Sequence, residues 1–361
     1  MSFTCGSIRA HERVDDGNPA QSVPPQRAIT TPAQGLPEGT RSGTGRRRRS
    51  LWAIALSNRK AAVGLFILAV FIFVAIFGPI IAPYDPNAFG VGLPSETPSH
   101  VHWLGTTRVG QDIWSQLLVG TRGSIVIGLL AGVLTTVLAV VIGVTSGYVG
   151  GWTDDLLSLI TNVFLTLPFV PVMIVIGSYA AAFNVKGVWV IIIMLTLTGW
   201  AYGARGKRAQ VLALRNKDFV MAARVTGDPA WRIVFIEILP NMISLVAATF
   251  LFSTVYAVLG EAGLEFIGLG DLNAVTWGTM LYYAQQNSAL LTGAWWWFVP
   301  PGLCIGLFAL SLTLMNYALD ELTNPRLRVE KVRAKRPASP AATATPPEIH
   351  ETETTPGVTI A

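Results

Sequence analysis

The chain has few charged residues: only 13% of its 361 residues are Asp, Glu, Lys or Arg. A soluble domain usually carries about 25% charged residues. Together with a mean hydropathy of +0.50, this shortage indicates a protein whose solvent is a lipid bilayer. Cysteine is also scarce. Cys5 lies in a polar segment and Cys304 in an apolar run, so a disulfide framework is not indicated.

Motifs for nucleotide binding and covalent chemistry are missing as well. The sequence has no GxxxxGK[ST] phosphate loop, because Ala201 stands at the first glycine position before Gly206-Lys207. No Ser-His-Asp, Cys-His or paired-carboxylate arrangement stands out. We therefore predict no catalytic residue, no enzyme activity and no ATPase site in this chain. His100 and His102 share a loop, and we expect no metal site there.

Both ends of the chain are polar. Residues 1–50 are rich in Pro, Gly, Arg, Ser and Thr and contain no apolar run that could act as a secretory signal. The last residues are rich in Pro, Ala, Thr and Glu. Such segments bury too little apolar surface to offset the entropy of ordering them, so we predict disordered tails at 1–50 and 326–361. We attribute the net charge of +5 to basic residues beside membrane spans, not to nucleic-acid binding.

Six apolar runs are long enough to cross a hydrocarbon core of about 30 Å as helices, at about 1.5 Å per residue. They cover residues 61–82, 124–147, 156–183, 187–204, 242–259 and 295–319. The third run contains Pro168 and Pro171, which predict a kink whose freed carbonyls need other partners. We expect an all-α membrane protein in which 51–123 holds the first helix and an extracytoplasmic segment, and 124–325 holds the other five.

The distribution of Lys and Arg predicts the orientation, because basic residues are enriched in cytoplasmic loops. Basic residues are dense before the first run, between the fourth and fifth runs, and after the sixth run. The opposite side holds only Arg108, Arg122 and Lys186. We therefore place both termini and loop 205–240 in the cytoplasm, and the segments around 84–122 and 260–294 outside.

Several polar and aromatic residues near the ends of the spans allow more than one interpretation. Trp295, Trp296 and Trp297 are expected to anchor the outer membrane interface. Residues 111–119 predict a short amphipathic helix that lies on the membrane or packs against a partner. Glu261 and Glu265, beyond the fifth run, are expected to be solvated or to line an outer gate, with substrate contact as the alternative.

Loop 205–240 is too long to be a simple connection. We expect a helix over 218–226, a left-handed Gly227, and a second helix that begins with Asp228 as N-cap and ends at Pro240. Small residues at the turn, Ala222 and Gly227 among them, would let another backbone approach closely. The loop is therefore either a docking element for a cytoplasmic partner or an ordinary hairpin at the membrane surface.

The sequence of this loop resembles the EAA loop of binding-protein-dependent ABC importer permeases. Residues Ala222, Ala223, Gly227, Leu239 and Pro240 keep the register of that pattern. The sequence departs from it at two positions, with Met221 in place of glutamate and Glu237 in place of isoleucine. A salt bridge from the glutamate of the motif is therefore unavailable here.

Two further segments resemble the dipeptide, oligopeptide and nickel permeases of this class. The first is HWLGT at 102–106 with GQDIWS at 110–115, where Thr107 and Gln111 replace the usual Asp and Arg. The second is EAGLEFIGLG at 261–270, followed by Trp277-Gly278. The resemblance covers roughly residues 58 to 326.

The resemblance implies a type I ABC importer permease fold in a bacterial cytoplasmic membrane. It implies four partner subunits: a second homologous permease, two cytoplasmic ATPases that bind ATP and Mg²⁺, and an extracytoplasmic solute-binding protein. The solute would be a dipeptide, an oligopeptide or nickel. A stand-alone channel or secondary transporter is the alternative, although the spans hold almost no ionisable residue for ion coupling. The residues implied to contact an ATPase are Asp218, Met221, Ala222, Ala223, Arg224, Gly227, Leu239 and Pro240.

Overall fold

The computed structural model describes residues 59–183, 185 and 187–323. The predicted tails 1–50 and 326–361, and Lys186, lie outside the described residues. The described part consists of helices and turns, with one isolated β-bridge between Thr106 and Asp112. The predicted all-α class is confirmed.

Five helices are long and apolar enough to cross a membrane: α2 (Arg59–Ile81), α3 (Ile113–Val149), α6 (Val188–Leu214), α10 (Ile243–Phe266) and α12 (Trp295–Thr323). The predicted third span is divided between α4 (Gly151–Thr166) and α5 (Phe169–Ala182), which are bent by 92°. If this pair counts as one broken span, the described chain has the six spans that the sequence predicts. The shorter elements are α7 (Asp218–Val225), α8 (Ala230–Arg232), the π-helical segment η1 (Ile233–Ile238), α9 (Leu239–Asn241) and α11 (Trp277–Gln286).

Helix α3 starts earlier than the sequence predicts, at Ile113 instead of residue 124. Asp112 caps it, because its Oδ2 accepts a hydrogen bond of 2.8 Å from the backbone N–H of Ser115. The expected separate surface helix at 111–119 is therefore wrong: these residues form the first turns of α3. Ile113, Leu117 and Leu118 are buried within the chain, so this apolar face packs against the chain's own core.

Helix α10 extends two turns beyond its predicted end and finishes at Phe266. The apolar run that predicts this span ends at residue 259, with an extension by one turn as the alternative, so Glu261 and Glu265 lie at or beyond its end. Both glutamates are fully buried, which contradicts the expectation that they are solvated. The expected row of interfacial tryptophans is also reduced to one, because Trp296 and Trp297 are buried and only Trp295 is exposed.

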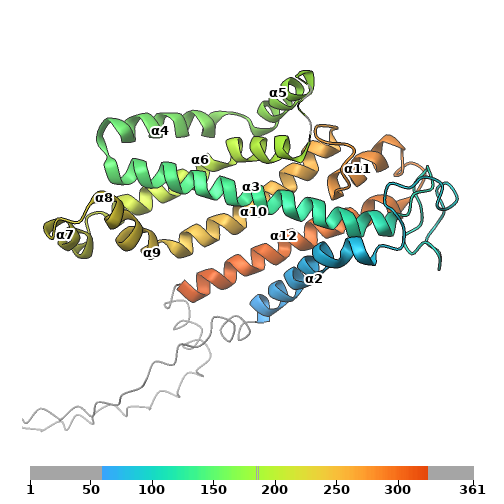
Figure 1. Cartoon of the computed structure of the whole chain (residues 1–361), viewed down its shortest axis with the longest axis horizontal. Coiled ribbons are helices and arrows are strands. Elements are labelled where there is room, and N and C mark those ends of the chain that lie inside the picture. Colours follow the sequence, from blue (N-terminus) through green and yellow to red (C-terminus); the bar gives the residue numbers. More distant parts are fainter. Residues whose placement is uncertain (1–58, 184, 186, 324–361) are drawn as a thin grey trace, which may run out of the picture. The chain divides into compact units, whose positions relative to one another are not determined.

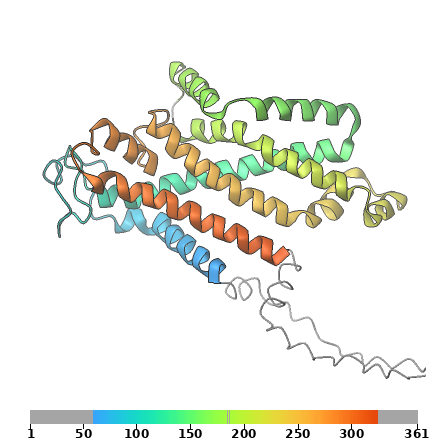
Figure 2. The ribbon, with the colours of Figure 1, turned by 180° about the vertical axis from the view of Figure 1, so that it is seen from behind.

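Helix α3 lies at the centre of the bundle and contacts α2, α4, α6, α10, α11 and α12 (Figure 1). Where α3 approaches neighbouring helices most closely, the contact residue on α3 is glycine. A Cβ added to Gly128 would lie 2.3 Å from Val258 of α10, and one added to Gly143 would lie 2.5 Å from the Ala204 carbonyl of α6. Small residues at such crossings let membrane helices pack closely. Helices α4 and α5 lie along one edge of the bundle, and α2 and α12 lie along the opposite edge (Figures 1 and 2).

The two ends of the bundle differ. Helices α7, α8 and α9 gather at one end, which we call the α7 end (Figure 1). Segment 82–112 and helix α11 lie at the other, which we call the α11 end. At the α11 end, Trp277 of α11 packs edge-on against Phe71 of α2 and Phe308 of α12, with ring centroids 5.7 and 6.0 Å away. These buried aromatic contacts fix α11 between two spans.

Candidate functional site

The α7 end carries a helical hairpin in which the predicted turn is confirmed. Helix α7 ends at Val225, and Gly227 has φ +82°, a left-handed conformation that favours glycine. The N–H of Gly227 donates to the Arg224 carbonyl at 3.1 Å, and the N–H of Asp228 donates to the Ala223 carbonyl at 3.1 Å. These bonds satisfy carbonyls at the end of α7, so the turn is tightly closed.

The second arm of the hairpin differs from the prediction in two ways. Pro229 is the N-cap of α8 in place of Asp228, whose Oδ1 instead accepts a hydrogen bond of 2.9 Å from Arg232. Pro240 does not end the helical path, because it lies in the first turn of α9, where its missing N–H costs little. The π-helical turns of η1 carry the chain directly into α9 and α10.

Helix α7 presents two different faces. Val220 and Ala223 are buried against Val211 of α6 and the apolar side chains of η1. Ala223 therefore packs inside the chain and is not available to a partner. The exposed face holds Asp218, Phe219, Met221, Ala222, Arg224 and Val225, with Gly227 beside it. Leu239 is half-buried and Pro240 is exposed, both at the junction with α10.

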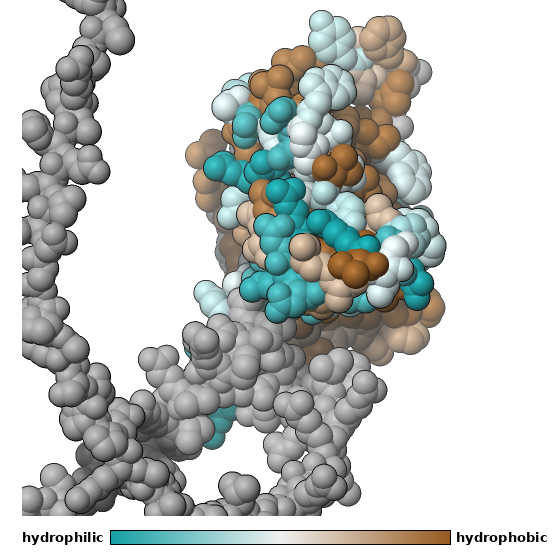
Figure 3. All heavy atoms as spheres, turned by 90° about the vertical axis from the view of Figure 1, so that its left-hand side faces the viewer, coloured by the Kyte–Doolittle hydropathy of each residue, from teal (hydrophilic) through white to brown (hydrophobic). Residues whose placement is uncertain are grey.

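The exposed face is more apolar than its position suggests. Val225 is 87% exposed and Met221 is 49% exposed, whereas the Arg224 guanidinium lies over the Tyr148 ring, 5.5 Å from its centroid. Seen end-on, polar side chains cross this end of the bundle with apolar side chains among them (Figure 3). Large apolar side chains on a polar end are typical of a surface that another protein covers.

Next to this hairpin, Asp154 joins three helices. Its carboxylate accepts two hydrogen bonds from the Arg208 guanidinium of α6, at 2.6 and 2.7 Å, and bonds from Ser146 of α3 and Ser158 of α4. Asp154 lies in the first turn of α4. The sequence did not indicate the pairing with Arg208, which is distant along the chain.

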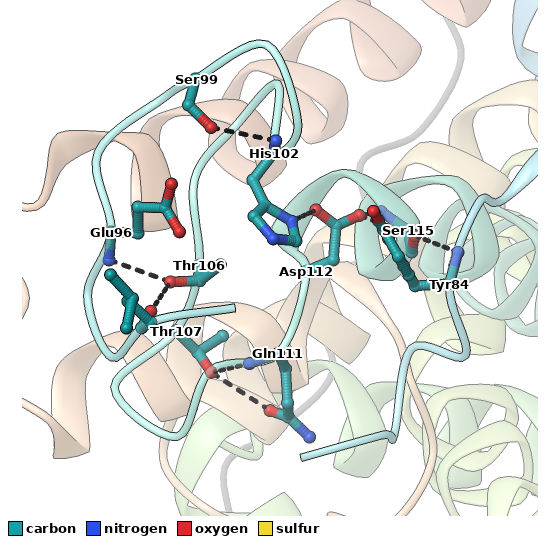
Figure 4. Close-up of polar contacts among 10 residues, drawn as sticks. Tyr84, Glu96, Ser99, His102, Thr106, Thr107, Gln111, Asp112 and Ser115 are labelled. Atoms are coloured by element: carbon teal, nitrogen blue, oxygen red, sulfur yellow. Dashed lines mark hydrogen bonds and ion pairs between the residues drawn. The ribbon is translucent and has the colours of Figure 1, made fainter. Parts of the chain in front are cut away.

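At the α11 end, segment 82–112 is held by a buried polar network (Figure 4). His102 Nδ1 lies 2.9 Å from Asp112 Oδ1, and the other carboxylate oxygen of Asp112 accepts from the hydroxyl of Ser115 at 2.6 Å. The Tyr84 N–H donates to the same Ser115 hydroxyl at 3.2 Å. The network therefore fastens both ends of segment 82–112 to the start of α3.

Thr107 and Gln111, which replace the Asp and Arg of the related permeases, are paired through neutral contacts. The Gln111 N–H donates to Thr107 Oγ1 at 3.1 Å (Figure 4). The Thr107 N–H donates to the Gln111 backbone carbonyl at 2.9 Å. Neutral side chains therefore hold the loop between residues 107 and 111 closed. Among the described residues, no group of three or more His, Cys, Asp or Glu side chains could hold a metal ion.

Glu261 and Glu265 lie on adjacent turns of α10 and join it to α3 and α11. Glu261 Oε1 accepts a hydrogen bond of 3.0 Å from Ser124 of α3, and the same hydroxyl accepts one from the Trp277 N–H of α11. Glu265 accepts a hydrogen bond from the Thr276 hydroxyl at the N-cap of α11. The sequence singled out the two glutamates but not Ser124 and Thr276, because a single small polar residue carries no distinguishing pattern.

Membrane-length helices around a glycine-lined α3, with an exposed helical hairpin at one end, define a polytopic membrane protein. The chain belongs to the family of binding-protein-dependent transport system inner membrane components, which matches residues 139–329. The N-terminal TM domain of oligopeptide transport permease C matches residues 48–98. The protein is thus a multi-pass inner-membrane permease of the ABC importer class, which works with a second permease and with ATPases.

Curated relatives support this assignment over most of their length. The chain is 33% identical over 285 residues to the oligopeptide transport system permease protein OppC of Bacillus subtilis, covering 77% of this chain and 91% of the relative. It is 32% identical to a putative peptide permease protein of Brucella suis, over 75% of this chain and 88% of the relative. It is 30% identical to the dipeptide transport system permease protein DppC of B. subtilis, over 77% of this chain and 85% of the relative.

Among solved structures, a MetNI methionine ABC transporter in an inward facing conformation aligns with a TM-score of 0.46 at 18% identity. The alignment covers 58% of this chain and 97% of that chain.

Proposed function

We propose that this chain forms one half of the pathway by which dipeptides or oligopeptides cross a bacterial inner membrane, driven by ATP hydrolysis in partner subunits. The peptide substrate is favoured over nickel because the relatives described above are named as peptide permeases. ATP and Mg²⁺ belong to two ATPase subunits, and a solute-binding protein delivers the peptide from outside. This chain supplies no ATPase site of its own.

The observation that carries the proposal is the exposed face of α7. Met221 and Val225 project from a closed turn, and an exposed apolar side chain that becomes buried stabilises a complex by about 25 cal/mol per Å² of apolar area. Because Met221 stands where related permeases have glutamate, apolar contact replaces an ion pair at this position. The α7 end therefore lies in the cytoplasm, with both termini, and its hairpin inserts into an ATPase groove.

This proposal is tested with a matched pair of variants. Val225 and Leu291 are both 87% exposed, at the α7 end and the α11 end respectively. Val225→Asp should reduce co-purification of the ATPase subunit with the full complex by at least about ten-fold, because an unpaired carboxylate would be buried in the groove. Leu291→Asp makes the same chemical change at the other end and should leave co-purification unchanged.

Peptide uptake by the same cells provides the second measurement. Uptake should fall in parallel with ATPase recovery in the Val225→Asp variant. Normal recovery of the ATPase with Val225→Asp would contradict the docking role of α7. Uphill peptide flux by the purified chain alone in liposomes would instead favour a secondary transporter.

A further inference from the structure

The length of α4 and the neighbours of the break lead us to place the break between α4 and α5 near the middle of the membrane. Asp154, paired with Arg208, marks the polar boundary at the α7 end, and Thr166 follows twelve residues later along α4. At about 1.5 Å per residue, Thr166 lies about 18 Å into a core about 30 Å thick. The rings of Phe164 and Trp200 are 5.2 Å apart, and those of Phe169 and Tyr256 are 5.0 Å apart, which places the break beside the middle of α6 and α10.

The backbone at this break is short of hydrogen-bond donors. Pro168 and Pro171 have no N–H, so the carbonyls of Phe164 and Leu167 lose the donors that a continuous helix would provide. Leu167 has an extended conformation, with φ −70° and ψ 129°, and both Leu167 and Pro168 are exposed. Non-helical backbone is tolerated at membrane depth where it is buried in protein or lines a water-filled cavity. The exposed break therefore cannot face lipid.

Polar side chains lead along α4 to the break. Asn162 and Thr166 are one helical turn apart on the same face, and both are exposed. The Thr166 hydroxyl donates to the Val163 carbonyl at 2.8 Å, whereas the Asn162 amide has no hydrogen-bond partner within the described part of the chain. An unpaired amide in hydrocarbon costs several kcal/mol, about 4–8 by transfer to an alkane. This face of α4 thus needs water or a polar partner.

Helix α2, on the opposite edge, shows what a lipid-facing surface looks like in this chain. It has no polar side chain after Lys60, and its exposed residues beyond that point are Val, Phe, Ile and one Ala. Helix α4 also exposes apolar side chains, among them Leu159, Ile160 and Val163, but unlike α2 it carries the exposed polar pair Asn162 and Thr166 among them. We therefore assign α2 to lipid and the strip of α4 that holds this pair to a polar environment.

A cavity beside Asn162 extends that polar environment towards the α7 end. It has a volume of about 280 Å³ and lies between α3, α4 and α6. Its polar lining includes Ser146, Ser158, Thr161, Asn162 and Arg205. At about 30 Å³ for each molecule of liquid water, the cavity has room for several waters. Water can therefore reach Asn162 from the membrane surface.

We propose that Asn162, Thr166 and the break at 167–168 line the water-filled solute pathway, where they hydrogen-bond the peptide groups of the passing solute. This inference rests on the proposed function. The donors and acceptors here are all uncharged: an amide, a hydroxyl and two backbone carbonyls. They match the backbone that all peptides share, whereas the charged group Arg205 lines the cavity nearer the α7 end.

The test is thiol accessibility in the full complex, in membranes opened so that reagent reaches both faces. Cys5 and Cys304 are first replaced by Ser, and Asn162→Cys and Thr166→Cys are made singly. The control is Phe73→Cys on α2, because Phe73 is 53% exposed on the edge assigned to lipid. A charged thiosulfonate reacts with the thiolate, which forms in water, so the two α4 variants should react faster than the control by at least about ten-fold.

Uptake measurements separate the two proposals. Before labelling, the α4 variants should transport peptide more slowly than the cysteine-free parent, because each has lost a hydrogen-bonding group. Labelling should abolish the remaining transport, while the labelled control keeps its transport. Variants that transport peptide but stay as unreactive as Phe73→Cys, with and without ATP, would overturn the pathway inference and leave the proposed function standing. The pathway inference would also be overturned if Asn162→Cys formed a disulfide cross-link to the second permease and did not react with the thiosulfonate. Normal labelling in a chain that transports no peptide would count against the proposed function.

Discussion

At the scale of single residues, the buried glutamates of α10 show how a membrane helix can hold acidic side chains far from solvent. Glu261 receives a hydrogen bond from Ser124, and that hydroxyl receives one from the backbone of α11. Each polar atom in this chain of contacts belongs to a different helix. The glutamates therefore join three helices at the α11 end, and removing one leaves a buried hydroxyl without its acceptor.

Glu261→Ala should lower the free energy of unfolding by about 1–3 kcal/mol, because the Ser124 hydroxyl loses its acceptor in a buried site. Glu261→Gln keeps an acceptor oxygen in the same place and should be close to wild type. The measurement is the thermal unfolding midpoint of the purified protein in detergent. Glu237→Ala, near the α7 end, serves as the control and should not change the midpoint. An equal loss with Gln and Ala would show that the hydrogen bond to Ser124 is not what stabilises this end.

At the scale of helices, the crossing of α3 with α6 depends on the absence of side-chain atoms. A Cβ on Gly143 would lie 2.5 Å from the Ala204 carbonyl and 2.9 Å from Lys207 Cβ, and one on Gly147 would lie 2.9 Å from Val211 Cβ. The Ala204 carbonyl is part of the backbone, so it cannot change rotamer to relieve the contact as a flexible side chain can. The two helices would have to separate to accept a larger residue.

Gly143→Val should therefore destabilise the protein by about 1–3 kcal/mol, the usual cost of overpacking a close contact. The matched control is Gly206→Val on α6, where a Cβ would meet nothing within 4 Å. The yield of folded protein and the thermal unfolding midpoint should fall for Gly143→Val and should match the wild-type values for Gly206→Val. Equal behaviour of the two variants would mean that the close crossing does not limit stability.

The sequence predicts helix number and type better than helix ends. Apolar runs locate every span because lipid requires about 20 apolar residues in a row. The start of α12 at Trp295 agrees with the predicted run, since a turn precedes it. The early start of α3 and the late end of α10 could not be predicted in this way, because tertiary contacts bury polar residues there that composition assigns to water.

The same limit applies to the candidate sites. The turn at Gly227 follows from local chemistry, so it is predictable. The burial of Ala223 depends on η1, and the partner of Asp154 lies in another helix 54 residues away, so neither is visible in local patterns. The prediction that the helix ends at Pro240 is wrong because a preceding π-helical stretch places this proline in the first turn of α9.

At the scale of the whole molecule, the orientation in the membrane decides which end meets which partner. We place segment 82–112 outside, where Arg108 is exposed in a loop held by the Gly90 N–H to Val109 carbonyl bond of 3.0 Å. Trypsin added to intact spheroplasts should cut at Arg108 but not at Lys217, near α7. The His102→Ala variant should be cut faster, because it loses the bond to Asp112 that holds the segment.

Cleavage products identified by mass provide the measurement. Opening the membrane should expose Lys217 as a control for trypsin activity. Cutting at Lys217 in intact spheroplasts would reverse the orientation and place the α7 hairpin outside, away from any ATPase.

Helix α3 has 37 residues and is therefore about 55 Å long, nearly twice the thickness of the hydrocarbon core. A rigid rod of that length works as a lever: a tilt of about 5° about its midpoint would displace each tip by about 2.4 Å, in opposite directions. One tip follows the N-cap Asp112, beside segment 82–112, and the other ends at Val149, close to the bond between Ser146 and the Asp154 carboxylate. A tilt of α3 imposed at one membrane surface therefore displaces the helix end at the other surface directly, without a second moving element.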